Sequence, residues 1–180
     1  SSLSAFARYQ QQEAWTWEQQ ALVKARFVAG DTRVGERFGS IRQRSLCRVR
    51  ELESLRRDVR EMREKMRDTL GAGEADVFDL KQDAGGIVDI EFLVQFGVLS
   101  RAHACAGLTE WTDVVRLLES LATAGFVTPD DAAFLKQAYC QYRDRVHRAA
   151  LQETPARAPA SEFEAERSRV RHIWNAIMIG

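Results

Sequence analysis

The segment KQDAGGIVDIEF, from Lys81 to Phe92, joins a glycine turn to the start of a strongly apolar stretch. Gly85 and Gly86 open backbone conformations that are closed to other residues and let the backbone approach a ligand closely. The residues that follow are apolar on nearly every side of a helix, which predicts a central helix, buried almost all round, that ends near Ala106. Its apolar residues are Ile87, Val88, Ile90, Phe92, Leu93, Val94, Phe96, Val98 and Leu99.

Two acids, Asp89 and Glu91, lie in this stretch, where carboxylates are seldom buried unless they are paired. Positions two residues apart differ by about 200° around a helix, so the two acids are predicted to face opposite sides. Glu91 and Gln95 share a face. The unpaired amides at the start of the helix, with Lys81 nearby, predict a site for an anion such as a phosphate. The alternative is that the acids pair with arginines of neighbouring helices.

The rest of the chain predicts further helices and no strand. Between Leu52 and Leu70, apolar residues recur at spacings of three and four, which indicates an amphipathic helix. The predicted helices are Ser4–Ala29, Thr32–Cys47, Arg50–Leu70, the central helix, Trp111–Ala124, Pro129–Gln152 and Glu162–Ile179. We therefore expect an all-α bundle of six or seven helices. It is predicted to form a single domain over residues 1–180, with a possible subdivision into 1–106 and 107–180.

The composition is that of a globular protein without a strong electrostatic field. The chain holds 26 basic and 26 acidic residues, a balance that does not favour nucleic-acid binding. No apolar run approaches the roughly 20 residues needed to cross a membrane, and no signal peptide opens the chain. We expect a cytoplasmic protein that binds neither nucleic acid nor membrane.

Several longer stretches carry a specific resemblance. They are EAWTWEQQALVKARFVAGD (residues 13–31), REMREKMR (60–67), FDLKQDAGGIVDIEFLVQ (78–95), WTDVVRLLESL (111–121) and ALQE (150–153). Together they resemble the bacterial glutamine synthetase adenylyltransferase family, whose bifunctional enzymes attach AMP to glutamine synthetase and remove it. In that family a helical region follows each of two nucleotidyltransferase domains, and this chain looks like the region after the C-terminal, adenylylating one. A related helical domain follows the nucleotidyltransferase of the PII-uridylylating enzyme.

The resemblance implies ATP and Mg²⁺ as cofactors of the intact enzyme, held by a preceding nucleotidyltransferase domain. Family members hold the ions with a Gly-Ser turn and two nearby acids on a sheet, and Gly39, Ser40, Glu51 and Glu53 copy that pattern superficially. Both glutamates, however, lie at the start of a predicted helix, where acids favour the helix dipole. We therefore expect no metal site, no catalytic residue and no bound cofactor in this chain, and interpret it as part of a larger enzyme.

The resemblance also suggests which residues approach the nucleotide. Lys81 and the amides of Gly85 and Gly86 are the candidates for phosphate contact, and Asp89 or Glu91 for orienting the phosphate or a ribose hydroxyl. A second candidate group, from the segment predicted to face the catalytic domain, consists of Glu18, Gln19, Lys24 and Arg26. The alternative is that Lys24, Arg26, Asp89 and Glu91 form ion pairs between helices and only support the loop.

A basic stretch runs from Arg42 to Arg67 and allows two interpretations. It is either a docking surface for an acidic partner or a solvated helix face with ion pairs such as Arg57 with Glu61 and Arg60 with Glu64, and we favour the solvated face.

Two functional hypotheses follow. In the first, the chain is the helical half of an adenylyltransferase and supplies contacts to the nucleotide and to glutamine synthetase. In the second, it is a regulatory module that binds the PII signalling protein or glutamine, which the family uses as effectors.

Overall fold

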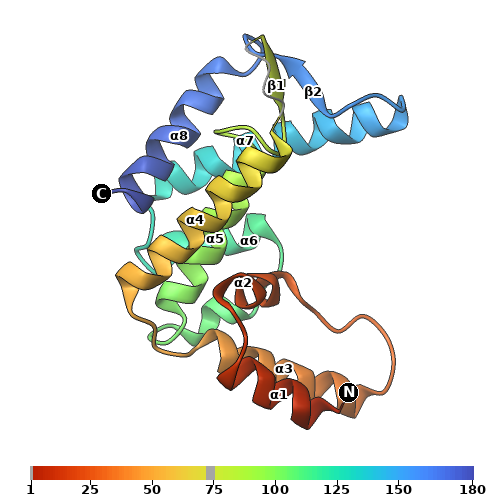
Figure 1. Cartoon of the computed structure of the whole chain (residues 1–180), viewed down its shortest axis with the longest axis vertical. Coiled ribbons are helices and arrows are strands. Elements are labelled where there is room, and N and C mark those ends of the chain that lie inside the picture. Colours follow the sequence, from red (N-terminus) through yellow and green to blue (C-terminus); the bar gives the residue numbers. More distant parts are fainter. Residues whose placement is uncertain (1, 72–75) are drawn as a thin grey trace.

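The computed structural model of the protein describes residues 2–71 and 76–180, which are mostly helical, as predicted (Figure 1). In order, the elements are α1 (Leu3–Gln12), α2 (Thr16–Lys24), α3 (Thr32–Leu46), α4 (Leu52–Leu70), β1 (Val77–Asp79), α5 (Ile87–Arg101), a 3₁₀ turn (Ala106–Thr109), α6 (Val114–Thr123), α7 (Pro129–Leu151), β2 (Arg157–Pro159) and α8 (Glu164–Met178). Helices α3, α4, α6, α7 and α8 lie within a few residues of their predicted ranges.

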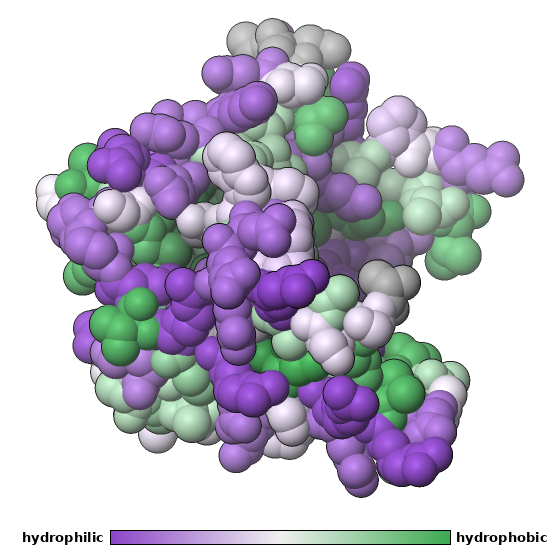
Figure 2. All heavy atoms as spheres, turned by 60° about the horizontal axis from the view of Figure 1, so that its bottom comes forward, coloured by the Kyte–Doolittle hydropathy of each residue, from purple (hydrophilic) through white to green (hydrophobic). Residues whose placement is uncertain are grey.

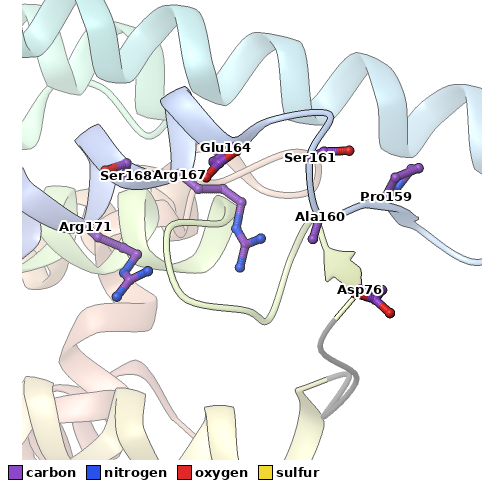
Figure 3. Close-up of a pocket in the computed structure, with 8 residues that line it drawn as sticks. All are labelled: Asp76, Pro159, Ala160, Ser161, Glu164, Arg167, Ser168 and Arg171. Carbon is purple, nitrogen blue, oxygen red and sulfur yellow. The ribbon is translucent and has the colours of Figure 1, made fainter.

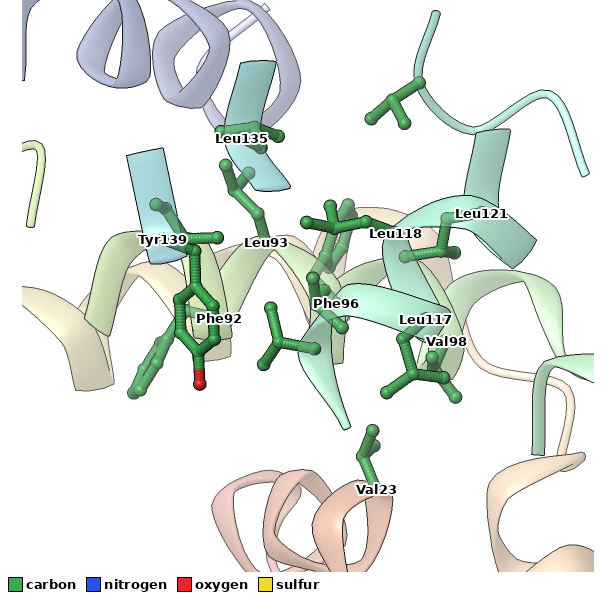
Figure 4. Packing of buried hydrophobic residues seen from close by; sticks show 14 of the residues in the cluster. Val23, Phe92, Leu93, Phe96, Val98, Leu117, Leu118, Leu121, Leu135 and Tyr139 are labelled. Carbon is green, nitrogen blue, oxygen red and sulfur yellow. The ribbon is translucent and has the colours of Figure 1, made fainter. Parts of the chain in front are cut away.

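Helix α5 is the centre of the structure, and its predicted burial is confirmed. It contacts α2, α4, α6, α7 and α8, so apolar side chains are needed on nearly every side. Figure 4 shows Phe92, Leu93 and Phe96 of α5 among side chains from α6 and α7. The helix ends at Arg101 instead of near Ala106, because the chain turns there and brings Leu108 into the core.

The prediction of one helix from Ser4 to Ala29 is wrong, since the segment forms α1 and α2. Glu18 restarts the helix by accepting a hydrogen bond from the Trp15 amide (2.9 Å), and it also accepts one from the Tyr9 hydroxyl. The buried guanidinium of Arg42 contacts the end of α2 by donating to the carbonyls of Leu22 and Val23, at 2.7 Å each. A local cap therefore starts α2, and a side chain from α3 contacts its end.

The two short strands were not predicted. Strands β1 and β2 pair antiparallel, with Phe78 opposite Ala158, and both of these side chains are buried. Three residues are too few to show an alternating pattern, and the partners lie 80 residues apart in the sequence. The ladder holds the start of the Lys81 segment against the chain that leads into α8.

The interpretation of Arg42 to Arg67 as a solvated face is only partly right. Part of the stretch does form a solvated face, where Arg60 approaches Glu64 at 4.0 Å as predicted. Arg57 approaches Asp58 instead of Glu61. Arg42 and Arg63, in contrast, are buried and donate to groups on other elements. A charged side chain that links two helices cannot be told from a surface one by its spacing.

Glu51 caps α4, as expected for an acid at a helix start. Its carboxylate accepts hydrogen bonds from the amides of Glu53 (2.9 Å) and Ser54 (2.6 Å), which lower the pKa of Glu51. A carboxylate whose pKa is lower in the folded state than in the unfolded state stabilises the fold at pH values above the ordinary glutamate pKa, about 4.3. This contribution disappears as the pH falls through the pKa of the folded state.

We expect Glu51→Ala to destabilise the protein near neutral pH and much less at strongly acid pH, measured by urea unfolding. Glu36→Ala, on the exposed side of α3, is the control, and an equal deficit at both pH values would contradict the capping role.

Candidate functional site

The loop that carries Lys81 is held by a dense set of hydrogen bonds. The Asp79 carboxylate accepts from the amides of Lys81 and Gln82, both at 2.9 Å, in the manner of a capped turn. The Lys81 carbonyl in turn accepts from the amide of Val88 at 3.2 Å. The Lys81 backbone is therefore fixed on both sides, while its side chain is exposed.

A buried ion pair anchors the same loop to α4. Arg63 and Asp89 have side-chain exposures of 0% and 1%, and Arg63 Nε lies 2.6 Å from Asp89 Oδ1. Arg67 approaches the same oxygen at 3.3 Å, and Arg63 Nη2 donates to the Gln82 carbonyl at 2.7 Å. Burial lowers the pKa of Arg63, and the adjacent Asp89 carboxylate opposes that shift. Asp89 thus pairs with arginines of a neighbouring helix, which is the alternative predicted from the sequence.

The glycines serve packing in this structure, and their amides are already used. The Gly85 amide donates to Asp89 Oδ2 at 2.7 Å, and the Gly86 amide donates to the Asp83 carbonyl at 3.0 Å. Gly85 has a φ of +85°, and a Cβ there would lie 2.6 Å from the Arg167 carbonyl oxygen of α8. The phosphate contacts expected from these two amides would therefore require breaking internal hydrogen bonds, and the glycines are explained by the close approach of α8.

Glu91 faces the opposite side of α5 from Asp89, as predicted. Lys24 Nζ lies 2.6 Å from Glu91 Oε1, and the Tyr139 hydroxyl donates to the same oxygen at 3.2 Å. One turn further along, Gln95 accepts a hydrogen bond from Gln20 at 2.9 Å, so Glu91 and Gln95 do share a face. Side chains of α2 and α7 meet at Glu91.

The residues around Glu91 line a hollowed surface region, here called the α7 groove. It consists of two adjoining hollows of about 410 and 470 Å³ that share Tyr139, Arg143 and His147 of α7. The first adds Lys24 and Arg26 after α2, and the second adds Lys81 and Glu91. These elements surround the open right-hand side of the molecule in Figure 1, and Figure 2 shows the same side hollowed.

A chain of polar contacts runs along the α7 groove. Arg143 donates to the Tyr139 hydroxyl at 3.2 Å, and its other terminal nitrogen lies 3.3 Å from His147 Nε2. Burial raises the pKa of Tyr139, so this side chain is a neutral donor to Glu91 at physiological pH. The hydrogen bond to Tyr139 raises the pKa of Arg143, which keeps its charge.

The sequence identified one side of the α7 groove and missed the other. Four cations line it, Lys24, Arg26, Lys81 and Arg143, against Glu91 and, at the far end, Asp113 and Asp144. Tyr139, Arg143 and His147 were not predicted, although their spacing of four residues places them on one face of a helix. That pattern alone does not say which neighbour the face meets.

Glu18, like Asp89 and the two glycines, lies outside the α7 groove. Its carboxylate caps α2 and accepts from the Tyr9 hydroxyl of α1 at 2.7 and 2.9 Å. The hydrogen bond to Glu18 raises the pKa of Tyr9.

The carboxylates present do not fit a Mg²⁺ site. Within residues 2–71 and 76–180, no three acidic, histidine or cysteine side chains gather as ligands. Glu51, which resembles a catalytic acid in the sequence pattern, accepts hydrogen bonds from helix amides with both of its carboxylate oxygens. We therefore assign no metal ligand among the residues that the structure describes.

A further hollow of about 630 Å³ lies beside the start of α8. Figure 3 shows Arg167 and Arg171 projecting from α8 in the same direction, with Asp76 on the opposite wall. The guanidinium of Arg167 lies 4.1 Å from the centre of the Phe78 ring, so this side chain covers the strand ladder.

In the part of the chain that the structure describes, no helix combines the length and the apolar character that a bilayer crossing requires.

The sequence matches two family models and several long relatives. A family described as GlnD PII-uridylyltransferase matches residues 50–158, and one described as glutamate-ammonia ligase adenylyltransferase matches residues 1–41. The bifunctional glutamine synthetase adenylyltransferase/adenylyl-removing enzyme of Methylococcus capsulatus is 54% identical over 178 residues, which is 99% of this chain and 19% of that protein. The enzymes of the same name from Pseudomonas aeruginosa and Pseudomonas putida are 48% and 47% identical, over 100% and 98% of this chain and 20% and 19% of their own lengths.

The chain has a helical fold, and it belongs to the family described as GlnD PII-uridylyltransferase, whose model matches residues 50–158. Its identity along nearly the whole sequence then groups it, as predicted, with the bifunctional glutamine synthetase adenylyltransferases. The chain spans about a fifth of the length of these relatives.

Proposed function

We propose that this chain is a helical domain of a glutamine synthetase adenylyltransferase, and that its α7 groove faces the nucleotide. In the intact bacterial enzyme, which we place in the cytoplasm, a preceding nucleotidyltransferase domain would bind ATP and Mg²⁺. The observation that supports the proposal is the gathering of Lys24, Arg26, Lys81 and Arg143 from three separate segments onto one concave surface.

The proposed reaction moves AMP from ATP to a tyrosine hydroxyl of glutamine synthetase. A bond forms between the tyrosine oxygen and the α-phosphorus, the bond to the β-phosphate breaks, pyrophosphate leaves, and the hydroxyl proton is lost. Negative charge accumulates on the leaving pyrophosphate, and fixed cations at that position stabilise it. We assign this role to the Lys81 and Arg143 side chains, with Lys24 and Arg26 further along the groove.

The framework around these cations supports the assignment. Glu91 holds both Lys24 and Tyr139, and Tyr139 holds Arg143, so three groove residues are positioned through one carboxylate of α5. Lys81 rests on a backbone that Asp79 fixes. Groups that are already oriented lose little freedom when they meet a phosphate, which is the requirement for electrostatic stabilisation of a transition state.

The test is an adenylylation assay with labelled ATP, Mg²⁺ and glutamine synthetase, on this chain joined to the nucleotidyltransferase domain. Replacing Lys81 or Arg143 by alanine is expected to lower the transfer rate about tenfold to hundredfold, since each removes a charged hydrogen-bond donor. Thermal unfolding should change little, because Lys81 and Arg143 are both exposed.

Two residues outside the α7 groove provide matched controls. Lys136 of α7 pairs with Glu119, and Arg145 of α7 pairs with Glu162. Lys136→Ala and Arg145→Ala should leave the rate nearly unchanged. Near-normal kinetics in the Lys81 and Arg143 variants would contradict the proposal and favour the regulatory hypothesis, for which binding of PII protein or glutamine to this chain is the direct test.

A further inference from the structure

Two tryptophans on the face where α2 meets α4 are unusually exposed. The relative exposure of Trp15 is 71% and that of Trp17 is 49%, although aromatic residues of this size are normally mostly buried. They line a cleft of about 280 Å³, here called the tryptophan cleft, together with Thr16, Asp58, Glu61, Met62 and Lys65. Its volume is below the roughly 300–1,000 Å³ of typical small-molecule sites, so it suits a single side chain.

The other two tryptophans of the chain are covered. Trp174 is buried in the core, and the guanidinium of Arg116 lies over the Trp111 ring at 4.3 Å from its centre. Arginines also lie over the rings of Phe78 and Phe134, at 4.1 and 4.2 Å. In the described ranges no cation of this chain covers Trp15 or Trp17, which leaves their faces open to a cation from outside.

Two carboxylates give the tryptophan cleft its charge. Asp58 is held in place by the Thr16 hydroxyl, which donates to Asp58 Oδ2 at 2.7 Å. Glu61 is exposed, and across residues 2–71 and 76–180 its carboxylate has neither a hydrogen bond nor an ion pair. Lys65 offsets one of the two negative charges, so the cleft carries a net charge of about −1.

We propose that the tryptophan cleft is a docking site for an arginine side chain on an exposed segment of a partner protein. A guanidinium stacks on indole faces, and its planar fork donates two parallel hydrogen bonds to a carboxylate. Trp15 and Trp17 supply the faces, and Glu61 supplies the free carboxylate. Met62 adds an apolar wall for the methylene part of the side chain. The site is separate from the cationic α7 groove and does not depend on its role.

The test is a titration of the ¹⁵N-labelled chain with a blocked Leu-Arg-Leu tripeptide, followed through the indole N–H resonances. These resonances are assigned with Trp15→Phe and Trp17→Phe. We expect saturable shifts for Trp15 and Trp17 and none for Trp111 and Trp174. Glu61→Gln should weaken binding about tenfold, the effect of losing a charged hydrogen-bond acceptor. Glu64→Gln, on the same helix beside Arg60 and outside the cleft, should leave binding unchanged.

Two further peptides keep the proposal falsifiable. The same tripeptide with citrulline is neutral but nearly the same shape, and we expect it to bind at least about tenfold more weakly. Equal binding of the citrulline peptide, or an unchanged affinity in Glu61→Gln, would overturn the proposal. A lysine peptide that binds as tightly as the arginine peptide would overturn the assignment to arginine. Absence of any indole shift with the arginine peptide would remove the site altogether.

Discussion

Replacing Asp89 by alanine is expected to lower the free energy of unfolding by about 3–5 kcal/mol. The change leaves the fully buried guanidinium of Arg63 without its carboxylate, and breaking one partner of a buried pair has a cost of this size. It also removes the acceptor of the Gly85 amide. Urea unfolding of the wild type and the variant measures the difference.

Two comparisons separate this effect from ordinary surface electrostatics. Glu53→Ala breaks an exposed ion pair with Arg56 and is expected to cost less than about 1 kcal/mol. The double variant Arg63→Met with Asp89→Leu removes both charges, and it should be more stable than Asp89→Ala because no charge is left buried alone. If Asp89→Ala lowered the free energy of unfolding by less than about 1 kcal/mol, water would have to reach Arg63, and the ion pair would not be buried in solution.

Replacing Gly85 by alanine is expected to destabilise the protein by about 2–5 kcal/mol. The positive φ disfavours any residue with a Cβ, by about 1–2 kcal/mol. The added methyl would also lie 2.6 Å from the carbonyl oxygen and 2.9 Å from the Cα of Arg167, both backbone atoms that cannot rotate away, which adds about 1–3 kcal/mol of overpacking. Helix α8 must move, and hydrogen exchange should show its amides losing protection.

Another glycine isolates the contribution of backbone conformation. Gly125 has a φ of +68° and open space where a Cβ would lie, so Gly125→Ala reports the conformational cost alone. We expect it to cost about 1–2 kcal/mol and to leave the hydrogen exchange of α8 unchanged. Equal losses for the two substitutions would mean that α8 does not press on the Lys81 loop in solution.

The sequence predicted the helical fold well because burial and periodicity are local signals. The apolar run after Gly86 defined α5, and the spacing from Leu52 to Leu70 defined α4. The break between α1 and α2 was missed because the Glu18 cap begins at Trp15, which is not a usual capping residue, and the end of α2 was missed because Arg42 lies on α3. The strand pair was missed because its two halves are short and far apart.

The candidate site was predictable where the spacing of two residues in a helix determines how their side chains are oriented relative to each other. The roughly 200° between Asp89 and Glu91 correctly placed them on opposite sides of the helix, which the structure shows to be the α4 side for Asp89 and the α2 side for Glu91. The role of the glycine amides could not be predicted, because their acceptors belong to the tertiary structure. The contribution of α7 was also hidden, since periodicity shows that Tyr139 and Arg143 share a face but not which helix that face meets.

The order of synthesis bears on the strand ladder and on the contact between Gly85 and α8. A chain that leaves the ribosome from its N-terminus presents β1 and the Lys81 loop long before β2 and Arg167 exist. Closing so long a loop carries an entropic cost that local helix pairs such as α6 and α7 avoid, so these pairs are expected to form first. The surface that carries Lys81 therefore takes its final shape only after α8 has emerged. A nascent chain halted before α8 would expose a Lys81 loop that lacks its packing contact with Arg167.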